Sequence, residues 1–252
     1  MAKGKTISSK PCTPRTPSTP TSASPVAGAP VAAGGSAPRT ISAPPTNLNT
    51  LVKRAAWATT AVIHRIHPDV YKAEQFNPGP IGNARFSPIF DATGTSIATI
   101  YGGTTFECAA METVFHDVPF GAGLKTVAKR KLRKHHYSQV TPAIELILAD
   151  LSNKALRKLG IPRGDLIDTE KDLYPQTRKW AEAIHAQCPD IHGLCWVSRQ
   201  DDTERAIILF ADRLPPAPLS SAAPSVDIVR DATTYAALVN LADDIGVKVT
   251  GK

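Results

Sequence analysis

A short strand followed by two glycines and a helix is the feature that most constrains how this chain folds. Residues 97–101 (Ile-Ala-Thr-Ile-Tyr) are apolar and β-branched, which is typical of a buried strand. Gly102 and Gly103 interrupt this strand. The apolar spacing that follows predicts a helix over about residues 106–116, which ends before Pro119 because proline cannot continue a helix.

The predicted helix carries two carboxylates with different expected roles. Thr104 or Thr105 can cap its first turn, since a hydroxyl accepts the backbone N–H groups left free there. Thr104 with Glu107 three residues later has the form of a capping box, so Glu107 needs no chemical role. Glu112 lies among apolar residues on the inner face. A solvated carboxylate is the ordinary explanation, but its place after the strand and Gly-Gly turn makes Glu112 a candidate catalytic residue.

An N-terminal segment differs in composition from the rest of the 252 residues. Residues 1–46 are rich in Pro, Ser, Thr, Ala and Gly and contain no Asp or Glu. Such a segment buries too little apolar surface to offset its conformational entropy, so we expect a disordered basic tail and one domain over residues 47–252. The tail supplies +5 of the formal net charge of +7 through Lys3, Lys5, Lys10, Arg15 and Arg39. The domain itself is therefore not predicted to be a broad nucleic-acid-binding surface, and the tail would bind nucleic acid only weakly.

Several classes of protein are not indicated. The first residues contain lysines but no apolar run after them, so they do not resemble a secretory signal, and no stretch has the roughly 20 apolar residues of a membrane helix. The four cysteines have no CxxC spacing, and no metal site is predicted. Reduced thiols fit a cytoplasmic protein, although Cys188 and Cys195 would be able to pair if their elements packed together.

The remaining pattern intermixes strands and helices without a βαβ rhythm. Strands are predicted at residues 61–67, 142–151, 191–199 and 205–211, the last two as a hairpin, and helices at 153–159, 174–188 and 233–245. Residues 48–60 suit a helix or an irregular lead-in, and residues 214–225 read as a Pro/Ala/Ser-rich loop. We therefore expect an α+β fold with a compact mixed β-sheet core and flanking helices.

Four further places carry residues that could bind a ligand. Arg65 lies inside the strand at 61–67, and Arg85 lies in a loop rich in Pro and Gly. An arginine fork can donate two parallel hydrogen bonds to a phosphate. A surface cation explains Arg65 equally well, and local sequence alone slightly favours a solvated loop cation for Arg85. Ser198 ends a predicted strand but has no GxSxG elbow around it, which argues against a serine hydrolase. The cations of residues 124–137 have no interleaved aromatics and suit a solvated face.

Taken in order, these residues resemble the RES domain family. The resemblance spans about residues 60–212 and rests on Arg65, Asn83-Ala-Arg85-Phe-Ser, Ile100-Tyr101-Gly-Gly, Cys108-Ala-Ala-Met-Glu112-Thr and Trp196-Val-Ser198-Arg199. The strongest part is the strand with its Tyr, the small residues and the helix with Ala-x-x-Glu. Two departures from the family pattern are an insertion at residues 90–96 and the long basic tail.

The resemblance implies a function. RES-domain proteins are toxins of bacterial toxin–antitoxin pairs that degrade NAD+, as phosphorylases or glycohydrolases, on an ADP-ribosyltransferase-like fold. Their partner is usually a helix-turn-helix antitoxin that covers the active site. Carried over to this chain, the family's Arg falls on Arg85, its Tyr on Tyr101, its Glu on Glu112 and its Ser on Ser198, and Arg65 matches a second, earlier Arg.

The residue types suit cleavage of the nicotinamide–ribose bond. That reaction passes through an oxocarbenium-like state, which the carboxylate of Glu112 can stabilise, as in glycoside hydrolysis. Arg85 or Arg65 can grip the pyrophosphate, Tyr101 can stack on nicotinamide, and Ser198 can hydrogen-bond an amide or phosphate. No Rossmann glycine fingerprint is present, so NAD+ is expected as substrate and no cofactor is predicted.

The sequence leaves the details of this function open. The nucleophile is either water or inorganic phosphate, which would then be a co-substrate. The oligomeric state is also open, so the chain could be a monomer or a homo-oligomer. Two other functions also fit: an ADP-ribosyltransferase that modifies a protein or nucleic acid, and a non-enzymatic module that binds nucleic acid through its cations.

Overall fold

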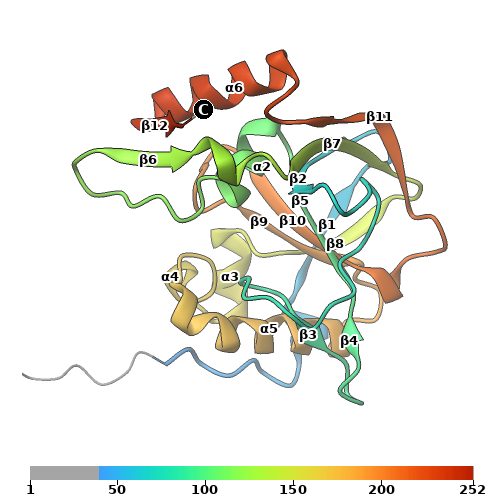
Figure 1. Cartoon of the computed structure of the whole chain (residues 1–252). Helices are drawn as coiled ribbons and strands as arrows, with labels where there is room; N and C mark the ends of the chain where they lie inside the picture. The colour runs from blue at the N-terminus through green and yellow to red at the C-terminus, as the bar shows by residue number, and fades with distance from the viewer. Residues whose placement is uncertain (1–39, 252) are drawn as a thin grey trace, which may run out of the picture. The chain divides into compact units, whose positions relative to one another are not determined.

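A computed structural model describes residues 40–251 of the chain, and an eight-stranded sheet lies at its centre (Figure 1). In spatial order its strands are β1 (Lys53–Trp57), β8 (Leu146–Asp150), β9 (Gly193–Val197), β10 (Arg205–Phe210), β5 (Thr99–Gly103), β2 (Ile63–Pro68), β7 (His135–Pro142) and β11 (Leu219–Asp227). Neighbouring strands are antiparallel except β8 and β9, which are parallel. The predicted α+β class with a mixed sheet is confirmed.

Two small sheets and several helices surround the large sheet. The small sheets pair β3 (Ile89–Phe90) with β4 (Ser96–Ile97) and β6 (Lys125–Ala128) with β12 (Val247–Thr250). The α-helices are α1 (Leu48–Leu51), α2 (Phe106–Thr113), α3 (Asn153–Leu159), α4 (Arg163–Leu166), α5 (Tyr174–Gln187) and α6 (Ala232–Asp244). Single 3₁₀ turns are η1 (Lys129–Lys131), η2 (Lys171–Leu173) and η3 (Ala211–Arg213).

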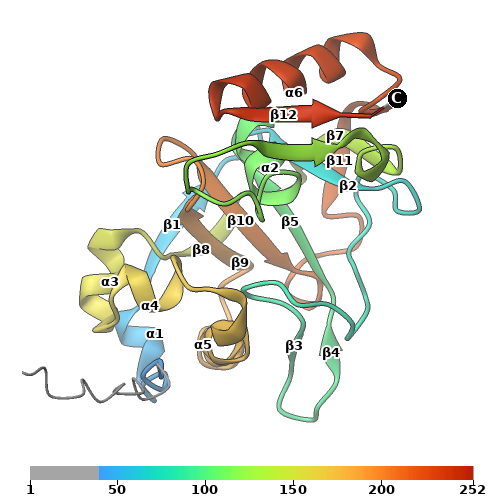
Figure 2. The same ribbon diagram turned by 60° about the vertical axis from the view of Figure 1, so that its left-hand side comes forward.

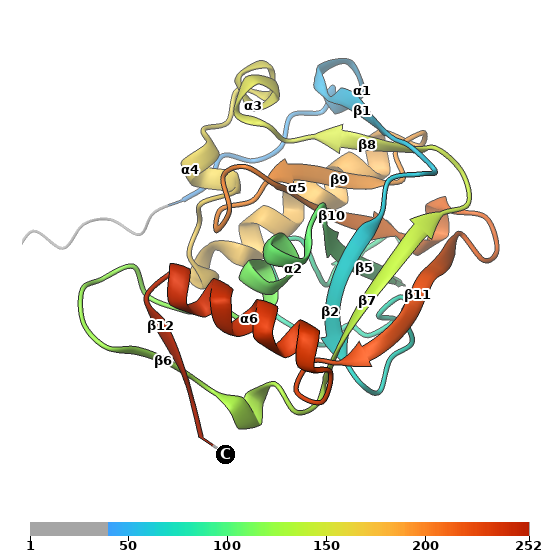
Figure 3. The ribbon, with the colours of Figure 1, turned by 90° about the horizontal axis from the view of Figure 1, so that it is seen from above.

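The large sheet curls around one apolar cluster to which every one of its strands contributes, from Trp57 on β1 to Leu219 on β11. Because side chains alternate along a strand, the opposite face carries its own apolar residues. One half of that face packs against α1, α3 and α5, and the other half against α2, α6 and β12. Figure 2 and Figure 3 show α2 with α6 on one side of this face and α5 on the other. The candidate site is a cavity lined by residues of α2 and by the first residue of α5.

Several local predictions are confirmed. Helix α3 ends at Gly160, whose φ of 73° is the left-handed conformation that favours glycine after a helix. Strands β9 and β10 form the expected antiparallel hairpin. The insertion at residues 90–96 forms the β3–β4 hairpin, and its Phe90 N–H donates to Glu182 of α5 at 3.2 Å. Cys188 and Cys195 are free thiols, and Cys12 lies outside the described residues.

Several strands differ from the sequence prediction. Strand β1 occupies residues where a helix or lead-in was expected, β7 begins inside the cation run, and β12 follows α6. Strand β11 replaces the predicted Pro/Ala/Ser-rich loop at the sheet edge, with register shifts on either side of Ala223. An edge strand tolerates proline because its outer N–H groups need no partner in the sheet. These strands form because the backbone N–H and C=O groups of a neighbouring strand pair with theirs. That pairing cannot be seen in the local sequence pattern.

Residues 40–46, which the sequence assigned to the tail, belong to the folded unit. Ile41 is buried, and its N–H donates to Gln176 of α5 at 2.6 Å. The indole N–H of Trp180 donates to the carbonyl of Ser42 at 2.8 Å. The predicted boundary at residue 46 is therefore wrong for these residues, because one buried isoleucine and hydrogen bonds to α5 hold them despite their tail-like composition. Residues 1–39 lie outside the described part of the chain.

Candidate functional site

The turn between β5 and α2 fixes where the helix lies. A Cβ on Gly103 would be 2.8 Å from Cys108 Sγ, so glycine allows α2 to pack directly on the strand end. Thr105 caps the helix by accepting the N–H of Cys108 at 3.1 Å. The hydroxyl of Thr104 instead contacts Glu204, so the predicted Thr104–Glu107 capping box is wrong. Thr105 and not Thr104 caps the helix because the hydroxyl of Thr104 contacts the backbone of Arg205 on β10.

Helix α2 ends at Thr113, one turn earlier than predicted. The N–H groups of Val114 and Phe115 both donate to the carbonyl of Ala110, which closes the helix in a turn. His116 therefore lies beyond the helix, and its side chain enters the same cavity as Glu112.

A serine hydroxyl holds the carboxylate of Glu112. Ser198 Oγ donates to Glu112 Oε1 at 2.7 Å, and it accepts the N–H groups of Gln200 and Asp201, each at 3.0 Å. Because both acceptor positions of this hydroxyl are taken, its proton is directed to the carboxylate. Ser198 is fully buried, whereas Glu112 is half-buried and lines the cavity. Ser198 therefore orients Glu112 and is unsuited to act as a nucleophile.

Arg85 is a buried cation with free hydrogen-bond donors. Only 4% of the residue is exposed, and its Nε and Nη2 are buried without any hydrogen-bond partner. Its guanidinium carbon lies 5.5 Å from the ring centroid of Tyr174, and its carbonyl accepts the hydroxyl of Thr177, so α5 holds this arginine from both ends. Arg178 on the same helix donates to Asn83 and Ala84. Free donors of a buried arginine that lines a cavity are suited to an anionic group.

Arg65 is buried like Arg85, but two of its guanidinium nitrogens have hydrogen-bond partners. Its Nε donates to the carbonyl of Tyr101 at 3.1 Å, and its Nη1 donates to the carbonyl of Ala73. Burial lowers the pKa of the guanidinium to about 10, so it is still charged at neutral pH. Arg65 thus ties β2 to β5 and to the loop after β2, while part of its side chain lines the cavity.

Tyr101 joins β5 to the loop that carries Arg85. Its hydroxyl accepts the N–H of Phe86 at 3.2 Å, and its ring meets Trp196 edge-on with centroids 6.3 Å apart. Burial raises the pKa of the Tyr101 phenol to about 12, so the group stays neutral. A ring held on two sides is a rigid wall of the cavity.

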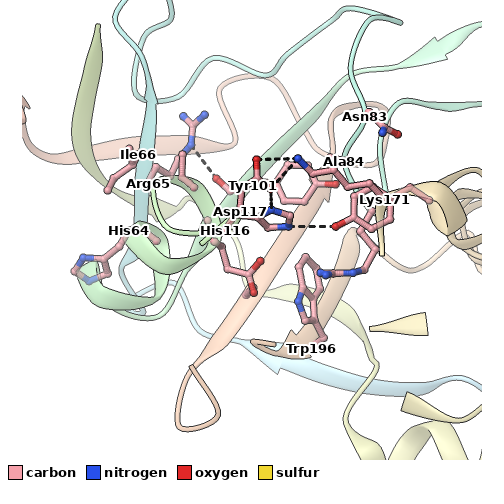
Figure 4. Close-up of a pocket in the computed structure, with 17 residues that line it drawn as sticks. His64, Arg65, Ile66, Asn83, Ala84, Tyr101, His116, Asp117, Lys171 and Trp196 are labelled. Atoms are coloured by element: carbon pink, nitrogen blue, oxygen red, sulfur yellow. Dashed lines mark hydrogen bonds and ion pairs between the residues drawn. The ribbon is translucent and has the colours of Figure 1, made fainter. Parts of the chain in front are cut away.

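These side chains meet at one cavity of about 360 Å³. Arg65, Arg85, Tyr101 and Glu112 line it, and Ser198 lies one hydrogen bond behind Glu112. All five predicted residues are thus brought together. Figure 4 shows the cavity from one side. The volume is at the lower end of the range for small-molecule sites.

Other polar and aromatic residues that line the cavity were given no role from the sequence. They are His64, Asn83, Thr113, His116, Asp117, Lys171, Tyr174 and Trp196. Trp196 stood within the resemblance without a role, and its buried indole N–H has no hydrogen-bond partner. His116 and Asp117 directly follow the helix of Glu112, which is the only local signal that could have found them.

The cation cluster at residues 125–134 lies apart from this cavity. It occupies β6, η1 and the residues before β7, and none of its members lines the cavity. Lys129 lies over the ring of Tyr235 of α6 at 4.6 Å. These cations therefore contribute to the surface around α6.

Within residues 40–251, no group of three or more His, Cys, Asp or Glu side chains is arranged to hold a metal ion. No helix in the same part of the chain is long and apolar enough to cross a membrane.

Comparison with known proteins identifies the family of this chain. A family model described as RES domain matches residues 62–231, which extends the resemblance seen in the sequence through β11. The chain belongs to the RES domain family. Its RES domain is similar to a chain of the solved M. tuberculosis MbcT–MbcA toxin–antitoxin complex, with a TM-score of 0.54 and 14% sequence identity over 75% of this chain and 92% of that chain. A search of curated protein sequences found no match.

Proposed function

We propose that this RES domain cleaves the nicotinamide–ribose bond of NAD+ and acts as the toxin of a toxin–antitoxin pair. The observation that carries the proposal is a buried arginine with free donors in the same cavity as a carboxylate held by a serine, namely Arg85, Glu112 and Ser198. A dinucleotide presents both groups that such a pair suits: an anionic pyrophosphate and a ribose that becomes cationic during cleavage.

Each side chain has a proposed part in the reaction. Arg85 donates Nε–H and Nη2–H to phosphate oxygens. Glu112, with one oxygen held by Ser198, places negative charge beside the developing oxocarbenium ion. Because the serine fixes the carboxylate before the substrate arrives, little reorganisation is needed in the transition state. Tyr101 forms an apolar wall for the nicotinamide ring.

The partners follow from the same proposal. NAD+ is the substrate and not a reusable cofactor, and inorganic phosphate is the alternative nucleophile to water. An uncontrolled NAD+-cleaving enzyme would harm its own cell, so a protein inhibitor is expected, as the MbcT–MbcA pair suggests. We propose a helix-turn-helix antitoxin for this role and the cytoplasm as the site of action.

The decisive experiment compares Glu112→Gln with Glu107→Gln. Glutamine keeps the shape of the carboxylate and can still accept the Ser198 hydroxyl, so the melting temperature should change little. Loss of the charge should lower kcat by about 10² with a smaller effect on KM, because the contact is made mainly in the transition state. Glu107 is exposed on the same helix and does not line the cavity, so Glu107→Gln should retain near-normal kcat.

The assay follows free nicotinamide from NAD+, with and without a macromolecular acceptor. Nicotinamide release without an acceptor supports the proposal. Release that occurs only while a protein or nucleic acid becomes labelled would indicate an ADP-ribosyltransferase instead. Absence of turnover together with strong, salt-dependent nucleic-acid binding would indicate a binding module. Normal turnover by correctly folded Glu112→Gln would contradict the role given to the carboxylate.

A further inference from the structure

A chain of polar contacts crosses the cavity wall outside the residues already assigned. Lys171 Nζ lies 2.7 and 2.8 Å from the two carboxylate oxygens of Asp117. Asp117 Oδ1 lies 2.8 Å from His116 Nδ1, and His116 Nε2 lies 3.1 Å from the hydroxyl of Tyr174. All four residues line the cavity, and Figure 4 shows the contacts of His116, Asp117 and Lys171 as dashed lines. The chain links the turn after α2 to the start of α5.

The contacts set the direction in which protons can move. An ionised carboxylate only accepts, so Asp117 takes the Nδ1–H of His116 and leaves Nε2 of the neutral imidazole as an acceptor. The Tyr174 hydroxyl then donates its proton to Nε2. Its oxygen keeps lone pairs that can accept a proton from a molecule in the cavity. The order of roles is that of a Ser-His-Asp triad, with a phenol in place of the serine.

The surroundings of Tyr174 favour such a role. The residue is 1% exposed, so its phenol group lies in a wall from which bulk water is excluded. Burial raises the pKa of Tyr174, and the nearby Arg85 and Arg199 oppose this shift. The phenol therefore holds its own proton at neutral pH until His116 can receive it. Arg85 stacks over the same ring. The chain from Tyr174 through His116 to Asp117, called the relay below, therefore lies beside the proposed anion-binding donors.

We propose that Tyr174 is a further catalytic residue that accepts a proton from the attacking water, with His116 and Asp117 as its positioning residues. The inference rests on the proposed function and makes the reaction a hydrolysis. Water oxygen bonds to C1 of the ribose while the C1–N bond breaks, and the electron pair leaves with neutral nicotinamide. The water proton passes to the Tyr174 oxygen as the Tyr174 proton passes to His116 Nε2. The imidazolium lies beside Asp117 and later releases the proton to solvent.

The relay distinguishes water from phosphate as nucleophile. A phosphate oxygen already carries negative charge and attacks without losing a proton. A proton acceptor in the cavity wall would therefore not raise the rate of its attack. Water must lose a proton to complete the same step, and a positioned acceptor contributes about 10² to 10⁴ to the rate. A proton-accepting chain is therefore expected in an NAD+ glycohydrolase.

The experiment uses the full chain with NAD+ in phosphate-free and phosphate-containing buffer, and separates ADP-ribose from its 1-phosphate ester. Wild type should release nicotinamide and ADP-ribose without phosphate. Tyr174→Phe keeps the ring under Arg85 but removes the hydroxyl, so kcat should fall at least ~10² with KM nearly unchanged. Its solvent deuterium isotope effect should also be smaller than that of wild type. Tyr235→Phe on α6 is the matched control, because Tyr235 does not line the cavity.

The positioning residues are tested through the same readouts. Asp117→Asn should lower kcat without changing KM, because an amide can favour the wrong imidazole tautomer, and Asp117→Glu should restore part of the loss. His116→Gln provides a second variant if Tyr174→Phe does not fold.

The outcomes of these experiments distinguish failure of the relay from failure of the proposed NAD+ cleavage. Nicotinamide release that requires phosphate and yields the 1-phosphate ester overturns the relay but leaves NAD+ cleavage standing. Folded Tyr174→Phe or His116→Gln with wild-type kcat also overturns the relay. Absence of nicotinamide release from wild type under every condition overturns the proposed function, and the relay with it.

Discussion

Arg65 and Arg85 differ in what their guanidinium groups contact, although both are almost fully buried. Arg65 donates to the carbonyls of Tyr101 and Ala73, so its fork is used to hold backbone segments together. Arg85 has two buried nitrogens without partners. Leaving a buried donor without a partner destabilises a fold by about 1–3 kcal/mol, which a bound anion would relieve. Arg85 is therefore the better candidate for binding the substrate.

Substitution of each arginine by lysine should separate binding from stability. Arg85→Lys keeps the charge but loses the planar fork, so KM for NAD+ should rise about 10-fold or more while the melting temperature changes little. Arg65→Lys should instead lower the melting temperature, because one ammonium replaces donors to two carbonyls. Steady-state kinetics and thermal melting measure both effects. A silent Arg85→Lys together with a raised KM in Arg65→Lys would transfer the anion-binding role to Arg65.

Helix α5 connects the N-terminal segment of the folded unit to the site. One of its faces accepts residues 41–48: Gln187 donates to the carbonyl of Pro45 at 3.0 Å and accepts the N–H of Leu48 at 2.9 Å. Thr177 and Arg178 on the same helix hold the loop that carries Arg85. Loss of the segment would therefore weaken an element that shapes the cavity.

Two truncated chains test this arrangement. A chain beginning at Thr40 keeps the contacts that residues 41–48 make with α5 and should melt at the temperature of the full chain, since the composition of residues 1–39 does not suit a core. A chain beginning at Asn47 loses buried Ile41 and leaves the Trp180 indole N–H without its partner. Its free energy of unfolding should fall by about 2–4 kcal/mol, which lowers the melting temperature by roughly 5–15 °C. Equal melting temperatures for the two chains would restore a boundary at residue 46.

At the scale of the whole molecule, a hydrogen-bond chain that begins at two buried residues ties three strands of the sheet together. His67 Nε2 on β2 lies 2.8 Å from Ser138 Oγ on β7, which lies 2.6 Å from Ser225 Oγ on β11. His67 Nδ1 lies 3.0 Å from the carbonyl of Pro68. Burial lowers the pKa of His67 to about 4, so the imidazole is neutral in the folded protein near neutral pH.

This histidine should make the fold less stable in mild acid. Between pH 6.5 and about 4, unfolded chains bind a proton at this residue that the folded protein does not, so stability falls as pH falls through this range. The contribution of His67 to the free energy of unfolding should be about 2 kcal/mol smaller at pH 5 than at pH 7. Urea unfolding at both pH values measures it against His67→Gln, which lacks the titrating group. An equal pH dependence in the two proteins would show that other groups cause it.

The sequence by itself determined the parts of the protein that depend on neighbouring residues along the chain. Strand β5, the glycine turn and α2 follow from apolar patterning and a threonine cap, and α3 ends where Gly160 provides the left-handed conformation. The β9–β10 hairpin and the place of Glu112 on the inner face of α2 were likewise predictable. Local hydrogen bonds and side-chain periodicity are the physical basis of all these features.

Only the tertiary structure decided which strands pair and which side chains meet. Strands β1 and β11 lack strong local patterns and form because β8 and β7 present open backbone edges to them. The contrast between Arg85 and Arg65 depends on carbonyls and rings from other segments. Likewise, His116 and Tyr174 are 58 residues apart in the chain and meet only because α2 and α5 pack on the same face of the sheet. Contacts of this kind depend on long-range packing, which no local sequence pattern encodes.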